Sequence, residues 1–186
     1  MEINTVDTAL LVMDMQMGIL QNFNATNTLV KSVSKAINYA RNKKIPVIYI
    51  RVGFRQGAPE LSTNNKIFSA GNRNYAATDM DAFMKIHPDI IPQADEMVVT
   101  KKRISAFTGS DLEVVLRSKN IRHIILTGIS TSGVVLSTVR EAANKDYRIT
   151  VLADGCGDRD EEVHRVLTTK IFPRQADVLT IDGWAN

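Results

Sequence analysis

The chain has 186 residues, of which 44% are hydrophobic and 23% charged, and its formal net charge is +3. These values are ordinary for a globular protein, and the length suits a single domain over residues 1–186. The basic residues are scattered rather than clustered, which argues against a nucleic-acid partner. No apolar run approaches the ~20 residues of a membrane span, and no signal-peptide pattern is present. The single cysteine, Cys156, cannot form an internal disulfide, so we expect a cytoplasmic protein.

Short apolar runs predict strands, and apolar residues at helical spacing between them predict helices. The expected strands cover residues 8–14, 46–50, 97–100, 124–127, 149–153 and 177–180. The expected helices cover residues 28–43, 111–118, 131–145 and 161–171. Strands that alternate with helices predict an α/β fold, a three-layer doubly wound sheet of six mostly parallel strands. The order 3-2-1-4-5-6 fits this fold, although spacing alone leaves the order open.

In such a sheet ligands bind beyond the carboxyl ends of the strands, near the switch point. Asp14, Arg51, Lys101 and the turn at residues 128–134 all follow strands and are expected around one crevice. Asp14 is either a catalytic acid or base or a residue that stops a strand. Lys101 either faces Asp14 or is a solvated member of a basic run. Arg51 either binds a substrate carboxylate or lies on the surface.

Other features of the sequence narrow the chemistry. The three histidines form no ligand pattern, so no metal site is expected. No Gly-x-Gly-x-x-Gly follows the first strand, and we expect no cofactor. Cys156 follows the fifth predicted strand between two glycines, which indicates a tight turn and a half-buried thiol rather than a nucleophile. The long stretch from residue 51 to about 78 is typical of a functional or a disordered loop.

The fourth strand turns sharply into a helix at Gly128–Val135, where backbone N–H groups and a positive dipole end face the crevice. Enzymes often place a nucleophile at such a turn, but Gly133 and Val134 have no reactive side chain. Several further motifs occur in a fixed order along the chain. They are Asp14-Met15-Gln16 after the first strand, Lys101 and Ser105-Ala106-Phe107 after the third, Gly128 and Thr131 after the fourth, Thr138 and Ala142 on the next helix, and Asp154 and His164 beyond.

In order and spacing these motifs resemble the isochorismatase-like hydrolase superfamily, the cysteine hydrolases, over almost the whole chain. The resemblance implies catalysis by Asp14 and Lys101 on a small-molecule substrate. The family's nucleophilic cysteine corresponds to Val134, and a valine cannot form an acyl-enzyme. Amide hydrolysis is therefore not expected, and the resemblance points to isochorismatases, which cleave a vinyl ether without a covalent intermediate. The alternative is an inactive family member that binds a small molecule or another protein.

The resemblance implies further features of the site. Substrate-binding residues are expected at Gln16, Arg51, Phe107, Ser130, Thr131 and Gly133. A cis peptide bond is expected between Ile129 and Ser130. The segment 53–78 is expected either to form one wall of the site, aided by a neighbouring subunit, or to be a mobile surface loop. The wall would take apolar contacts from Phe54, Phe68 and Tyr75 and charge from Arg55 and Arg73. A homodimer or a higher homo-oligomer is expected.

Overall fold

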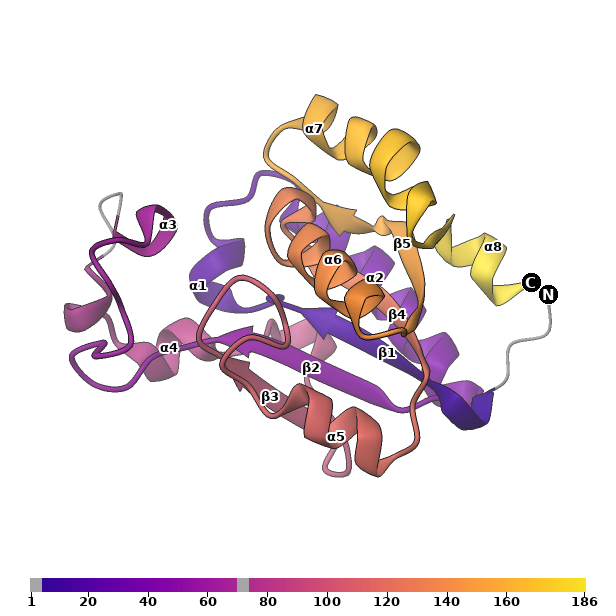
Figure 1. Cartoon of the computed structure of the whole chain (residues 1–186), viewed down its shortest axis with the longest axis horizontal. Helices are drawn as coiled ribbons and strands as arrows, with labels where there is room; N and C mark the ends of the chain where they lie inside the picture. Colours follow the sequence, from indigo (N-terminus) through magenta and orange to yellow (C-terminus); the bar gives the residue numbers. More distant parts are fainter. Residues whose placement is uncertain (1–4, 70–73) are drawn as a thin grey trace.

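One parallel sheet of six strands forms the centre of the protein, in a computed structural model that describes residues 5–69 and 74–186 (Figure 1). The strands are β1 Thr8–Met13, β2 Val47–Val52, β3 Met97–Lys101, β4 His123–Ile129, β5 Arg148–Gly157 and β6 Asp177–Leu179. Their order is β3-β2-β1-β4-β5-β6. The predicted doubly wound order is confirmed, and every neighbouring pair is parallel.

The helices connect the strands and flank the sheet. They are α1 Met17–Leu20, α2 Thr26–Asn42, α3 Lys66–Ser69, α4 Met80–Met84, α5 Leu112–Ser118, α6 Leu136–Asn144, α7 Glu161–Val166 and α8 Ile181–Ala185. A π-helical turn at Thr131–Val135 leads into α6, and another at Leu167–Ile171 follows α7. The sequence predicted none of α1, α3, α4 and α8, because a helix of four or five residues is too short to show a helical period.

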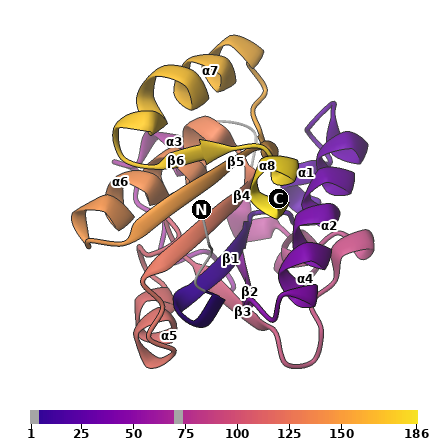
Figure 2. The same ribbon diagram turned by 90° about the vertical axis from the view of Figure 1, so that its right-hand side faces the viewer.

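Helices cover both faces of the sheet, and the burial of β1 follows from this (Figure 2). Leu11 and Met13 contact the core under α5 and α6, whereas Leu10 and Val12 contact the core under α2 and α8. Every residue of β1 is buried. A strand buried on both faces carries a continuous apolar run rather than an alternating one, which is the pattern of the sequence here.

Strand β5 is longer than predicted and corrects the expectation of a tight turn around Cys156. It continues to Gly157, with Gly128 paired to Cys156 and Ile129 to Gly157 after a register shift at which the extra residues lie in β5. The neighbouring glycines allow close packing: a Cβ on Gly157 would lie 2.8 Å from the Phe23 ring. The sequence prediction was wrong because a glycine that serves close packing resembles a glycine that serves a turn.

The segment after β2 leaves the sheet and forms a separate small core. Val52, Phe54, Ala58 and Phe83 are buried together there. Figure 1 shows α3 and α4 set apart from the sheet, on the side where the arrowhead of β2 ends. No helix in the described part of the chain is long and apolar enough to cross a membrane.

Candidate active site

Asp14 directly follows β1 and is held in an uncommon backbone conformation. Its φ is +56°, in the left-handed region that Asp and Asn enter more readily than most residues. Its backbone N–H donates to the carbonyl of Ile50 at 2.8 Å, which keeps the residue attached to β2. The residue is 5% exposed. The structure thus places a buried carboxyl group at the carboxyl end of the central strand.

Lys101 ends β3 and forms an ion pair with Asp14. Its Nζ lies 2.9 Å from Asp14 Oδ2 and donates to the carbonyls of Arg103 at 3.1 Å and Ile104 at 3.0 Å. The lysine is only 2% exposed, so it is not a solvated member of a basic run. An ammonium group has three N–H donors, and here all three have acceptors. Lys101 is therefore a fixed cation rather than a mobile one.

The second oxygen of Asp14 has no partner. Oδ1 is buried and accepts no hydrogen bond from the described residues. Burial raises the pKa of Asp14 above its ordinary value, and the nearby Lys101 opposes this rise. An unpaired buried oxygen is costly for a carboxylate and less costly for a carboxylic acid. Oδ1 is therefore the oxygen that would carry the proton whenever Asp14 is protonated, while Oδ2 contacts Lys101.

The turn between β4 and α6 forms the adjacent wall. The predicted cis peptide bond between Ile129 and Ser130 is present. The Gly133 N–H donates to the carbonyl of Ser130 at 3.1 Å, which closes the turn. Thr131 is fully buried, and its Oγ1 lies 2.8 Å from His164 Nδ1 on α7. Thr131 thus joins the turn to α7, and its side chain does not line the cavity.

A cavity of about 720 Å³ opens above these groups. It is lined by Asp14, Ile19, Gln21, Asn22, Phe23, Val52, Ile67, Phe68, Tyr75, Lys101, Ile104, Ile129, Ser130, Ser132, Gly133, Val134, Asp158 and Arg159. Of the residues expected from the sequence, the structure brings Asp14, Lys101, Ser130, Gly133 and Val134 together here. The volume is in the range of small-molecule sites.

Gln16, Arg51 and Phe107 do not line this cavity. Gln16 is fully buried, and its Nε2 donates to the carbonyls of Val52 at 3.0 Å and Phe83 at 3.1 Å. Its Oε1 accepts from the Val52 N–H at 2.8 Å, so the side chain links β2 to α4. Arg51 Nε donates to Thr100 Oγ1 at 3.0 Å. These contacts give both side chains a role in holding the sheet and its connections together.

Phe107 lies in the core on the α5 and α6 face of the sheet. It is 6% exposed, and its ring centroid is 5.8 Å from that of Tyr147. Lys145 Nζ lies 5.6 Å from the centre of the same ring. The Phe107 side chain therefore contributes to packing beside the third-strand loop.

Part of the segment 53–78 does form a wall of the cavity. Ile67, Phe68 and Tyr75 line it, and the Phe54 ring packs edge-on against Phe68 and Tyr75 from behind. Arg55 instead pairs with Glu60 at 2.9 Å, away from the cavity. Arg73 lies outside the described residues. The apolar half of the predicted wall is present, whereas Arg55, the described one of the two arginines predicted to supply its charge, does not line the cavity.

Cys156 is buried inside β5 and does not line the cavity. Burial raises the pKa of its thiol to about 12, and Asp154 contributes a smaller rise. The thiol is a weak donor to the carbonyl of Leu126 at 3.8 Å. Its burial agrees with the prediction that this cysteine is not the nucleophile.

Sequence reasoning missed the residues on the two loops that close the cavity. Asn22 and Phe23 follow the short helix α1, and Asp158 and Arg159 follow β5. Asp158 Oδ2 accepts the Ser132 N–H at 2.6 Å, which joins the β5–α7 loop to the β4–α6 turn. The only signal in the sequence was the position of Asp158 and Arg159 after a strand of the sheet. No periodic pattern marks the loop after α1.

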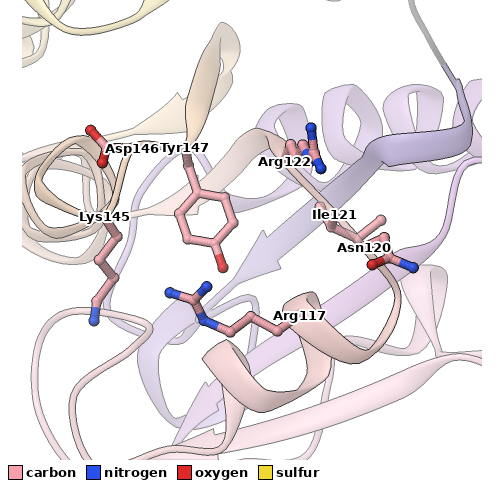
Figure 3. A pocket seen from close by; sticks show the side chains of 7 residues that line it. All are labelled: Arg117, Asn120, Ile121, Arg122, Lys145, Asp146 and Tyr147. Atoms are coloured by element: carbon pink, nitrogen blue, oxygen red, sulfur yellow. The ribbon is translucent and has the colours of Figure 1, made fainter.

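A second pocket, of about 390 Å³, lies at the opposite end of the sheet (Figure 3). It is lined by Arg117, residues 120–122 and residues 145–147, which precede β4 and β5. Two of its cations, Arg117 and Lys145, both pair with Glu113 at 2.6 Å. Ligands of doubly wound sheets bind at the carboxyl ends of the strands, so the Asp14 cavity is the candidate active site. No group of three His, Cys, Asp or Glu side chains suited to a metal occurs in residues 5–69 and 74–186.

Comparisons with known proteins agree with this geometry. The family profile of the isochorismatase domain matches residues 8–183, which include all six strands and the Asp14 cavity. The chain belongs to the isochorismatase family. A family protein of Bacillus subtilis is 30% identical over 167 residues, covering 90% of this chain and 86% of the relative. A ureidoacrylate amidohydrolase of Pseudomonas savastanoi is 31% identical over 205 residues, covering 97% of this chain and 80% of that enzyme.

Solved structures of the isochorismatase family share the fold. A family protein of Burkholderia thailandensis has a TM-score of 0.87 at 28% identity, covering 97% of this chain and 94% of the other. N-carbamoylsarcosine amidase of Thermoplasma acidophilum has a TM-score of 0.76 at 26% identity, covering 95% and 97%. Named relatives of this isochorismatase-family chain are thus hydrolases.

Proposed function

We propose that this isochorismatase-family chain hydrolyses a small anionic metabolite by non-covalent acid catalysis, with Asp14 as the proton donor. The observation that carries the proposal is the unpartnered Oδ1 of Asp14, buried beside a cavity of about 720 Å³. A general acid must hold a proton at the working pH, and burial raises the pKa of this carboxyl group. A fixed Lys101 at Oδ2 leaves Oδ1 to carry the proton.

Val134 supports a mechanism without a covalent intermediate. The family resemblance assigns the nucleophilic cysteine to this position, and the valine lines the cavity. Its side chain cannot attack a carbonyl carbon. Cys156 does not line the cavity, and its thiol has a pKa of about 12. The amide hydrolysis named for the relatives would need a thiolate that this site lacks, so we infer a different bond specificity.

A vinyl ether is the substrate class that these groups suit. Asp14 donates its proton to the terminal methylene carbon, and the π electrons of the double bond form the new C–H bond. The resulting oxocarbenium ion takes up water, which returns a proton to the Asp14 carboxylate. The hemiketal then collapses to a ketone and an alcohol. Lys101 stabilises the carboxylate that exists between the two proton transfers, because it lies 2.9 Å from Oδ2.

A non-catalytic binding protein is the second candidate function. The observation in its favour is the satisfied ion pair: Lys101 has acceptors for all three donors, which is also expected of a structural cation. A protein of this kind would keep the cavity and bind a small molecule without turning it over. The two functions differ in a measurable way, since only the first releases product.

The test compares vinyl ether and amide substrates with the same protein. The purified chain is incubated with isochorismate, ureidoacrylate, N-carbamoylsarcosine and nicotinamide. Pyruvate is measured with lactate dehydrogenase, and ammonia with glutamate dehydrogenase. We expect pyruvate from the vinyl ether and no ammonia from any amide, with Cys156→Ala as an active control. Ammonia release would overturn the proposal. Binding of isochorismate without pyruvate release would favour the non-catalytic function.

A further inference from the structure

The cavity contains one cation that no protein group engages, among the residues the structure describes. The charged residues that line it are Asp14, Lys101, Asp158 and Arg159. The three N–H donors of Lys101 all have acceptors, namely Asp14 and two backbone carbonyls. Arg159 is exposed and makes neither a hydrogen bond nor an ion pair with a described residue. Its guanidinium group is therefore available to a ligand in a way that the lysine is not.

The two acidic residues beside Arg159 in the sequence, Asp158 and Asp160, accept hydrogen bonds from backbone N–H groups. Asp158 Oδ2 accepts the Ser132 N–H at 2.6 Å. Asp160 caps α7, where its Oδ1 accepts from the Glu162 N–H at 2.9 Å and the Val163 N–H at 3.1 Å. Carboxylates engaged in this way at helix starts are partly compensated by the helix dipole. They leave the guanidinium as the unengaged charge of this loop.

Arg159 lies where two hollows meet. An adjoining pocket of about 370 Å³ shares Asn22, Phe23, Asp158 and Arg159 with the main cavity. The adjoining pocket also contains Glu161, whose negative charge disfavours an anion there. Among the described residues, the acidic groups that line the main cavity are Asp14 and Asp158, and both have partners. An anion held by Arg159 is thus favoured on the Asp14 side.

We propose that Arg159 binds the carboxylate of the substrate and so determines the preference of this enzyme for anions. The inference rests on the proposed function, because it assigns a contact within the same cavity. A guanidinium group presents two parallel N–H donors to a planar carboxylate. Asn22 lies on the same rim of the cavity and offers an amide as a second polar contact.

The apolar lining of the cavity defines the rest of the substrate. Phe68 and Tyr75 bring aromatic rings to the cavity, Ile67 lies beside them, and Phe23 lies next to Asn22. Flat, unsaturated or aromatic groups pack well against such rings. The substrate class is therefore a small carboxylate with a flat apolar body, oriented by Arg159 at one end and protonated by Asp14.

Benzoate and benzamide form the probe pair for this site. They have the same size and shape, and only benzoate carries the charge. Binding to the intact chain is measured by calorimetry, and shifts in the NMR signals of the Ser130–Val134 turn report whether the probe occupies the cavity. We expect the wild-type protein to prefer benzoate. In Arg159→Gln this preference should fall by about 10- to 100-fold, the value of a charge-assisted hydrogen-bonded pair. Arg159→Lys should keep part of it, because it keeps the charge and loses the fork.

Arg165→Gln is the matched control. It removes the same charge from the next helix, where Arg165 pairs with Glu162, and should leave the preference unchanged. Equal preference for benzoate in Arg159→Gln and wild type would overturn the proposal, as would a wild-type protein without any preference. Asp14→Asn separates this inference from the proposed function: it should lose turnover, and adding Arg159→Gln to it should still lower the benzoate preference. If the wild-type protein turns over the vinyl ether and Arg159→Gln keeps the full benzoate preference, only the proposed carboxylate contact is refuted and the proposed function stands.

Discussion

At the scale of single residues, burial determines what Asp14 and Lys101 can do. An exposed aspartate at a strand end ordinarily serves as a turn residue, and an exposed lysine there is ordinarily a solvated cation. In the structure both are buried and their side chains meet at 2.9 Å. Removing one partner of such a pair leaves an uncompensated charge, so the two residues act as a unit.

Asp14→Asn tests the acid directly. The amide keeps the shape of the side chain and removes the transferable proton, so turnover should fall by about 10²- to 10⁴-fold. In the wild-type protein, activity should fall as the pH rises through the pKa of Asp14, which burial moves upward. Steady-state rates across a pH series measure both effects. Full turnover by Asp14→Asn would contradict the mechanism.

Val134→Cys tests whether position 134 is reactive. In a Cys156→Ala background, the new thiol would line the same cavity as Lys101. We expect iodoacetamide to modify it roughly 10- to 100-fold faster than Cys156 in the wild-type protein, because thiolate fraction controls the rate. Mass spectrometry over time gives both rates. The wild-type protein is the control, since burial raises the pKa of the Cys156 thiol to about 12. Rapid modification of Cys156 in the wild-type protein would contradict the conclusion that Cys156 is an unreactive, buried thiol.

At the scale of elements, the β4–α6 turn depends on a close approach between two strands. Gly128 has a φ of +126°, and a Cβ at this position would lie 1.9 Å from the carbonyl oxygen of Met13. β1 and β4 are paired at these same residues. The glycine therefore allows the turn to begin directly beside Asp14.

Gly128→Ala should destabilise the protein strongly. The added methyl group collides with backbone that belongs to a paired strand, and we expect the free energy of unfolding to fall by about 3 kcal/mol or more. Gly57→Ala is the matched control, because Gly57 also has a positive φ, +76°, but a methyl group added there would meet no atom within 4 Å. It should cost about 1 kcal/mol. Urea unfolding measures both, and equal losses would contradict the close-approach argument.

At the scale of the whole molecule, polar groups link strands across the amino end of the sheet. His123 on β4 is 6% exposed, with Nε2 2.8 Å from Thr150 Oγ1 on β5 and Nδ1 3.4 Å from Thr8 Oγ1 on β1. Burial lowers the pKa of His123 to about 4, and the positive charge of Arg148 contributes. A neutral imidazole thus joins three neighbouring strands.

This histidine makes stability depend on pH in a defined window. The folded pKa of about 4 lies below the unfolded value of 6.5, so the unfolded state binds the proton more readily. The contribution of His123 is complete above pH ~6.5 and is lost as the pH falls towards ~4. By pH 5 the loss should reach about 2 kcal/mol, at ~1.4 kcal/mol per pH unit. When the pH is lowered to 5, the free energy of unfolding of His123→Gln, measured with urea, should decline by that much less than the free energy of unfolding of the wild-type protein. Above pH 7 the two proteins should change in parallel, and equal declines at pH 5 would refute the assignment.

The sequence by itself determined the α/β fold and the family, and it predicted that Asp14 and Lys101 would lie around one crevice. Apolar runs mark buried parallel strands, and the carboxyl ends of such strands meet at one edge. Asp14 and Lys101 follow strands in the sequence, so their meeting could be predicted before the structure was known. The cis peptide bond at Ile129 was predictable only through the family resemblance.

The tertiary structure alone decided how the remaining side chains are used. Gln16 and Arg159 both follow strands. The Gln16 side chain forms hydrogen bonds with backbone groups of β2 and α4. Arg159 instead lines the cavity without a partner among the described residues. Nothing local to either residue distinguishes these outcomes. The contacts of a side chain beyond a strand depend on which distant segment packs beside it. The hydrophobic periodicity of the sequence does not show which segments these are.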